Sequence, residues 1–387
     1  MKWKMNYEDV IKQETLRLYS EWLPYTVGTD NKNITFDDWY KRANLVFFSD
    51  SHIDFENPEE SLQNVKDTVN FINESPVLID AVMHGGDIIT PFYLFKKEDA
   101  LKRATSFFEA VKKSKAPFLF AKGNHDLNDW ENLPEEVITD NDWGNLFLNE
   151  AEEKYGIVRQ NKANGLKSTW HYYDIEAHKI RIVILDVQDS DKKSVTENGT
   201  VKYHGGVSTH ITNEQMNWIA SDALNFDEKE EKDWGVIFCF HQFPQNKKTA
   251  VNILLELSKA FKNQSTYTFK HTNPDNEFFN LYINADFTRY KNLEKKPHFI
   301  CWLVGHEHED NHFIMDGINI IYTLNNSATD VASDARVARI TGTVTQNAFD
   351  ILNIDTKQRK IRMFRYGAGV NCYGIGGSRF LPDGLSY

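Results

Sequence analysis

The stretch PFLFAKGNHD, residues 117–126, decides how this chain is understood. Its apolar first half has the composition of a buried strand, and Gly123-Asn124-His125-Asp126 is typical of a tight loop at the carboxyl end of that strand. An amide, an imidazole and a carboxylate on one turn would each need a buried partner inside a core. We therefore interpret them as residues of a catalytic rim.

Polar residues end four other apolar runs in the same way. Between the first three runs, residues 57–75 and 98–113 have apolar residues at helical spacing, which predicts parallel strand–helix–strand units. The carboxyl ends of such strands share one edge of the sheet, where sites normally form. The polar ends are Asp50-Ser51-His52 after residues 45–48, Gly86-Asp87 after 81–83, His241 after 236–240, and Gly305-His306-Glu307-His308 after 299–304.

Composition indicates a globular protein with a substantial core, because 41% of its 387 residues are hydrophobic. A net charge of −12 argues against nucleic acid or an anionic membrane as partner. Three widely spaced cysteines form neither a disulfide framework nor a thiolate metal site. Residues 1–14 contain no apolar segment of the signal-peptide kind, and no run approaches a membrane span, so we expect a cytoplasmic location.

The remaining segments suggest one catalytic domain, residues 44–387, preceded by a helical arm, residues 1–43. Thr35 and Asp38 resemble a capping box for a short helix within the arm. Residues 127–167 show no periodic pattern and are expected to be irregular. Residues 262–296 exceed the usual loop length, which predicts a lid or a substrate-selecting insertion.

Seven of the strand-end residues carry metal-ligating side chains. Oxygen and nitrogen donors without a thiolate suit Mn, Fe, Zn or Co. Seven ligands are too many for one catalytic ion; with one bridging carboxylate they divide over two ions roughly 3.5–4 Å apart, which suits metal-dependent hydrolysis of a phosphoryl group. The seven are Asp50, His52, Asp87, Asn124, His241, His306 and His308.

Taken together, these motifs resemble the calcineurin-like metallophosphoesterase superfamily, whose pattern is D-x-H, GD, GNHD, H and GHxH. The resemblance implies an α/β fold: a β-sandwich flanked by helices in four αββα layers. It also implies that His125 contacts the phosphate and assists the leaving oxygen, and that Asp126 orients His125. For the two ions, it implies that Asp50, His52 and His308 hold one, that Asn124, His241 and His306 hold the other, and that Asp87 bridges them.

The expected activity is hydrolysis of a small-molecule phosphate mono- or diester by a dinuclear centre of Mn, Fe or Zn, with a bridging hydroxide as nucleophile. The third motif is GNHD rather than GNHE, which disfavours the protein phosphatase branch. Thr90 stands where purple acid phosphatases place a tyrosine ligand. Two alternatives stay open: a nuclease of the same superfamily, and a metal-binding scaffold without turnover.

Eight other histidines lie outside the motif set. We expect seven of them to be structural or on the surface: His84, His171, His178, His204, His210, His271 and His298. His312, four residues after His308, is a weaker candidate for a contact behind the ligands.

Overall fold

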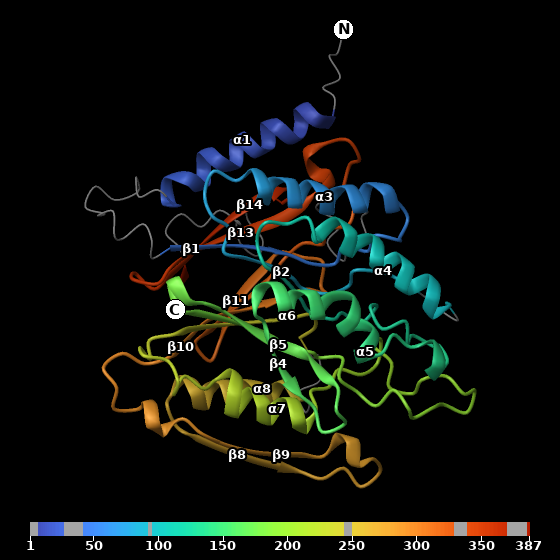
Figure 1. The fold of residues 1–387 in the computed structure, drawn as a ribbon, viewed down its shortest axis with the longest axis vertical. Helices are drawn as coiled ribbons and strands as arrows, with labels where there is room; N and C mark the ends of the chain where they lie inside the picture. Colours follow the sequence, from blue (N-terminus) through green and yellow to red (C-terminus); the bar gives the residue numbers. More distant parts are fainter. Residues whose placement is uncertain (1–6, 27–41, 92–94, 244–249, 329–338, 370–384) are drawn as a thin grey trace.

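Two β-sheets face each other, and helices cover the outer face of each sheet (Figure 1). The structure, a computed structural model, describes residues 7–26, 42–91, 95–243, 250–328, 339–369 and 385–387. Helices α1, α3 and α4 lie over the first sheet, and α7 and α8 lie over the second. The predicted α/β fold, a β-sandwich flanked by helices, is therefore confirmed.

The first sheet has the strand order β15-β14-β13-β1-β2-β3. As predicted, its first three strands in the chain are parallel and are joined by two helices. Strand β13 pairs antiparallel with β1 and continues through the tight turn after Asp355 into β14. The elements are β1 (Arg42–Phe48), α3 (Pro58–Glu74), β2 (Ala81–His84), α4 (Lys97–Val111), β3 (Phe118–Phe120), β13 (Ala348–Asp355), β14 (Lys360–Gly367) and β15 (Leu385–Ser386).

The second sheet has the order β11-β12-β10-β7-β6-β5-β4. Strands β6, β7, β10 and β12 are parallel, and β5 forms an antiparallel hairpin with β6. Helix α7 begins after Thr212, whose side chain caps it by accepting a hydrogen bond from the Gln215 amide. The elements are β4 (Val158–Asn161), β5 (Lys167–Ile175), β6 (Ile180–Ile184), α7 (Asn213–Trp218), β7 (Gly235–Phe240), α8 (Ala250–Lys262), β10 (His298–Val304), β11 (Asn311–Met315) and β12 (Ile318–Tyr322).

The central strands β6 and β7 of the second sheet are buried on both faces, which explains why they are continuously apolar rather than alternating. On β6, Ile182 packs into the core between the two sheets, whereas its neighbour Val183 packs into the core beneath α7 and α8. The same alternation continues on β7, where Cys239 faces the first core and Phe238 the second. Both β6 and β7 therefore contribute to two hydrophobic cores.

Both insertions contain regular structure. The expectation that residues 127–167 are irregular is wrong: α5 (Asp140–Trp143), a π-helical turn (Gly144–Leu148) and α6 (Asn149–Tyr155) lead into β4. Their packing is aromatic, with the rings of Trp143 and Phe147 4.5 Å apart. Within residues 262–296, the strands β8 (Thr266–His271) and β9 (Leu281–Asp286) form an antiparallel ribbon beyond α7 and α8 (Figure 1).

The chain's first described helix, α1 (Tyr7–Thr26), is docked on the first sheet. Leu18 and Trp22 are fully buried, and the Trp22 indole donates a hydrogen bond to Asn44 on β1 (3.1 Å). The capping box expected at Thr35 and Asp38 lies outside the described residues. Of the helices in the described ranges, none combines the length and apolarity needed to cross a bilayer.

One buried arginine joins the carboxyl-terminal strands to the end of the last motif. The Arg365 guanidinium, on β14, pairs with Asp350 at 2.8 Å and with Asp310 at 2.6 Å, and its side chain is 1% exposed. Its backbone carbonyl accepts a hydrogen bond from Arg17 of α1 (2.6 Å). Asp310 lies two residues after His308, so this cluster connects three distant parts of the chain.

We expect Arg365→Met to lower the free energy of unfolding by roughly 3–5 kcal/mol, because two buried carboxylates lose their counter-charge. Urea denaturation measures this. Arg289→Met, which breaks a half-exposed pair with Asp227, is the control and should cost about 1 kcal/mol or less. A loss for Arg365→Met as small as that of the control would contradict the structural role of the cluster.

Candidate metal centre

All nine site residues predicted from the sequence lie at one end of the two sheets. Short backbone hydrogen bonds tie the strand-end loops together: the Asp50 amide donates to Gly86 (2.9 Å) and the Gly305 amide to His241 (3.0 Å). Across the sheets, the His306 amide donates to the Asp50 carboxylate (3.0 Å). Two glycines permit this approach, since a Cβ at Gly123 would overlap the Asp87 carboxylate and one at Gly305 would overlap Ser49.

The backbone at the site is unusual for residues other than glycine. Left-handed φ angles, which cost a non-glycine residue about 1–3 kcal/mol, persist only where the surroundings enforce them. Such residues cluster at functional sites. Five of the seven predicted ligands adopt these angles: Asp50 (56°), His52 (39°), Asp87 (54°), His306 (73°) and His308 (53°).

The side chains form two groups, each able to hold a metal ion, and Asp87 is common to both. Within each group the donor atoms lie within 4.8 Å of one another, and nearly all these residues are buried. Asn124 joins the second group, because its Oδ1 lies 2.9 Å from His241 Nε2. The first group contains Asp50, His52, Asp87 and His308; the second contains Asp87, His241 and His306.

Short distances between donor atoms indicate that the arrangement suits bound cations. The Nε2 atoms of His52 and His308 are 3.2 Å apart, and His308 Nε2 is 3.2 Å from Asp50 Oδ1. In these positions the nitrogens and the carboxylate oxygen point at a common volume. Buried carboxylates and imidazoles are the donors that Mn, Fe and Zn accept, so this donor set fits a metal centre.

Electrostatics favour the ligating form of three donors, His52, His306 and Asp50, and oppose it in His241, which would lose a proton when a metal binds. Burial lowers the pKa of His52 to about 3 and that of His306 to about 4, so both rings are neutral at pH 7. Burial alone would raise the pKa of Asp50, but His308 and His241 hold it below its usual range. For His241, the carboxylates of Asp87 and Asp50 overcome burial and raise the pKa to about 9.

His125 lies beside the ligand groups. Its backbone amide donates to Asp87 Oδ1 (2.9 Å), and its ring meets that of His52 edge-on, with centroids 5.5 Å apart. On the other side the ring packs against Trp130 (4.8 Å, 31°). Burial lowers the pKa of His125. The imidazole thus lies against one ligand, His52, and against Trp130, which lines the cavity described below.

The Asp126 carboxylate is directed at the backbone of two loops. Oδ2 accepts from the amides of Asp87 (2.9 Å) and Gly123 (2.7 Å), and Oδ1 accepts from the amides of Ile88 (2.7 Å) and Ile89 (3.3 Å). These bonds fix the second motif against the third. An influence of Asp126 on His125 would therefore be transmitted by the backbone that carries both residues.

Several contacts behind the ligands are not visible in the motif pattern. Thr90 Oγ1 lies 2.5 Å from His52 Nδ1, the Gly85 carbonyl lies 2.8 Å from His241 Nδ1, and Gln242 donates to His306 (3.1 Å). Partners of this kind fix ring orientation and tune ligand strength. For Gln242 the sequence offers one indication, because this residue directly follows the predicted ligand His241. For Thr90 and Gly85 it offers only their nearness to Asp87 in the chain.

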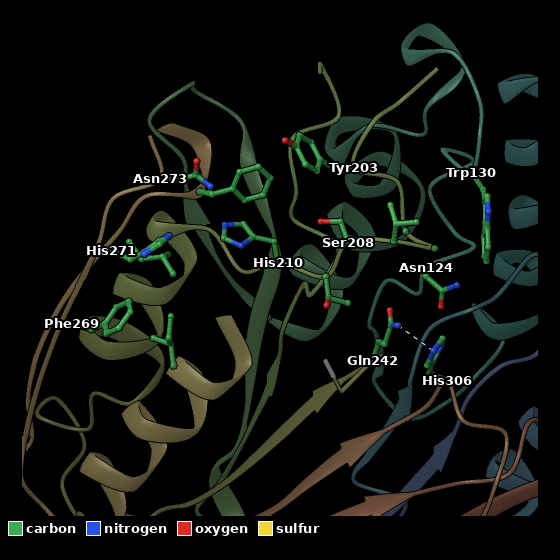
Figure 2. A pocket seen from close by; sticks show the side chains of 17 residues that line it. Asn124, Trp130, Tyr203, Ser208, His210, Gln242, Phe269, His271, Asn273 and His306 are labelled. Atoms are coloured by element: carbon green, nitrogen blue, oxygen red, sulfur yellow. Dashed lines mark hydrogen bonds between the residues drawn. The ribbon is translucent and has the colours of Figure 1, made fainter. Parts of the chain in front are cut away.

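A cavity of about 740 Å³ opens beside the second ligand group (Figure 2). Asn124, Gln242 and His306 form one end, Trp130, Tyr203 and residues 205–210 form one wall, and the β8–β9 ribbon supplies Phe269, His271, Asn273 and Leu281 on the other side. The insertion at residues 262–296 therefore contributes directly to the cavity.

Of the histidines outside the motifs, His84 has the expected structural role: its ring lies 2.9 Å from Ser51 Oγ and accepts from the Gly86 amide. His312 bonds to Asn319 (3.1 Å) on the neighbouring strand β12. His271 is exposed, as expected for a surface histidine, and His210 is buried, but both also line the cavity, which the sequence did not predict. No local pattern marks them, since long-range packing brings them there.

Comparison with known proteins identifies one family. A model described as calcineurin-like phosphoesterase matches residues 43–310. No curated protein matches the chain. Solved structures with a similar fold include a Thermus thermophilus protein (13% identity; 83% of this chain and 97% of that one; TM-score 0.33), an archaeal phosphodiesterase (10%; 83% and 99%; 0.32) and GAP50 of Plasmodium (9%; 84% and 89%; 0.40).

Proposed function

Because this chain belongs to the calcineurin-like phosphoesterase family, we propose that it hydrolyses small phosphate esters at a centre of two divalent metal ions, Mn, Fe or Zn. The observation that carries the proposal is the sharing of Asp87 between two ligand groups. A single carboxylate common to two sets of donors is the arrangement that a bridged pair of ions requires.

We assign Asp50, His52 and His308 to one ion and Asn124, His241 and His306 to the other, with Asp87 as the bridge. Two ions, when bound, would supply an activated water and positive charge beside the phosphoryl oxygens. The protein's own contribution is to hold His52 and His306 as neutral imidazoles and Asp50 as a carboxylate, and to fix the directions of the rings through Thr90, Gly85 and Gln242.

His125 is assigned to the leaving group. Its ring contacts His52 of the first ligand group and Trp130 of the cavity wall, so we place it within reach of the departing oxygen of an ester bound there, to which it can donate a proton. Asp126 is assigned a positioning role, since it holds the loop on which His125 stands.

The test is a panel of phosphomonoesters, cyclic nucleotides and phosphodiesters, assayed with Mn, Fe, Zn and Co in turn. We expect at least one class to be cleaved, the activity to disappear with a chelator, and the activity to return with the added metal. If the protein binds two metal equivalents and cleaves no ester in the panel, the result would instead support the alternative of a metal-binding scaffold without turnover. Salt-sensitive DNA binding with DNA cleavage would instead identify the nuclease.

A further inference from the structure

The cavity beside the ligand groups is larger than a phosphoryl group requires. Its volume of about 740 Å³ falls in the range of roughly 300–1,000 Å³ that is usual for whole organic ligands. Asn124 and His306 lie at one end, and His271 and Phe269 of the ribbon lie at the other, with His210 between them (Figure 2). A bound ester therefore has space to extend from the ligand groups to the ribbon.

Aromatic rings form part of the wall. The Phe279 ring meets Tyr203 edge-on at 4.8 Å and His210 edge-on at 4.9 Å between centroids. Phe269, Ile253 and Leu281 continue an apolar surface toward the ribbon. Rigid rings and aliphatic groups of this kind favour a flat ligand, which stacks on them at little entropic cost.

One polar atom in this wall has no partner in the described protein. His210 is 7% exposed, and its Nε2 is buried without a hydrogen bond. Burial lowers the pKa of His210 to about 4, so the ring is neutral at pH 7 and offers an uncharged hydrogen-bonding atom. A buried polar atom left unpaired is destabilising, so a ligand that pairs with it gains affinity.

The wall is held in place by the protein itself. Lys192 pairs with the buried Asp129 (2.7 Å) and donates to the Tyr203 carbonyl (2.9 Å). Asp129 also accepts from the Gly205 amide (3.1 Å), and it lies three residues after Asp126. A preformed wall loses little entropy when a ligand binds.

We propose that this cavity binds the organic group of the phosphoester, and that this group carries a flat, uncharged ring with a hydrogen-bonding edge, as a nucleoside does. Phe279 and Tyr203 contact the ring, and His210 Nε2 pairs with its edge. The orientation of the ligand, with its phosphoryl group at Asn124 and His306, rests on the proposed hydrolysis. Binding in the cavity can be tested without turnover.

The kinetic test compares three esters of equal charge: those of thymidine, benzyl alcohol and cyclohexylmethanol. They are used as monophosphates or as methyl diesters, whichever class the panel shows to be cleaved. The thymidine ring is flat and hydrogen-bonding, the benzyl ring is only flat, and the cyclohexyl ring is neither. We expect kcat/KM to fall in that order.

Two variants separate the contributions. Phe279→Ala should lower kcat/KM for the thymidine and benzyl esters roughly 10-fold, through lost stacking, and leave the cyclohexylmethyl ester within about 2-fold. His210→Phe should lower kcat/KM for the thymidine ester alone, by roughly 3- to 10-fold, because one hydrogen bond is lost. Tyr282→Ala, on the same ribbon but outside the cavity lining, is the matched control and should change none of the three.

Binding of free thymidine to the metal-free protein, followed by calorimetry, provides a readout without catalysis. It should be weakened by both cavity variants and unchanged by Tyr282→Ala. Equal kcat/KM for all three esters would overturn the inference and leave the proposed hydrolysis intact. Thymidine binding that depends on His210 and Phe279, in a protein that cleaves no ester, would support the cavity assignment and reject the proposed function.

Discussion

Asp87→Asn is expected to release both metal ions and to reduce hydrolysis to the level of the metal-free protein. Asp87 is the residue common to the two ligand groups; its Oδ2 lies 3.1 Å from His241 Nε2 and 3.8 Å from His52 Nε2. Asparagine keeps the shape and one oxygen, so the His125 amide keeps an acceptor, but the negative charge between the ions is lost. Two cations close together without a shared anion repel each other.

Metal content measured by mass spectrometry after gel filtration is the direct readout. The metal-free variant should still unfold in one cooperative transition but melt lower than the metal-free wild type, because the buried His241 ring loses the carboxylate that pairs with it. Asp67→Asn, at another buried carboxylate that bonds to Tyr7 (2.8 Å), is the control and should leave metal content unchanged. An Asp87→Asn protein that retains two ions would refute the bridging assignment.

His125→Ala is expected to lower kcat by roughly 10²–10⁴-fold through lost general-acid assistance, while metal content stays at the wild-type level. The reason is position: the ring contacts His52 of the first ligand group and Trp130 of the cavity wall, and its backbone amide, which the substitution retains, is the part that bonds to Asp87. Loss of metal in this variant would contradict the assignment.

The dependence on leaving group sharpens this test. A nitrophenyl ester leaves as a stable anion and needs little protonation, so the variant should lose much less activity on it than on an alkyl ester. His204→Ala is the matched control, because the His204 ring also packs on Trp130, with centroids 5.8 Å apart, but belongs to neither ligand group. Equal losses on both esters would indicate that His125 only supports the site.

Local patterns in the sequence predicted most elements of the fold. The continuous apolar runs and the helical spacing between them located β1, α3, β2, α4 and β3 within a few residues, because burial and periodicity are local properties. The insertion at residues 127–167 was missed, since its short helices pack through Trp143 and Phe147 without a repeating apolar face. A continuously apolar pattern does not indicate which sheet a strand joins. The expected division into two sheets therefore came from the family resemblance.

The candidate site divides in the same way. By itself the sequence determined the donor types, their places at strand ends and the family, because these depend on residues next to one another in the chain. Only the tertiary structure decided which donors face each other: His52 and His308 are 256 positions apart and 3.2 Å apart in space. The packing of two sheets sets such distances, and the same packing brings His210 and the β8–β9 ribbon to the cavity, which no local pattern encodes.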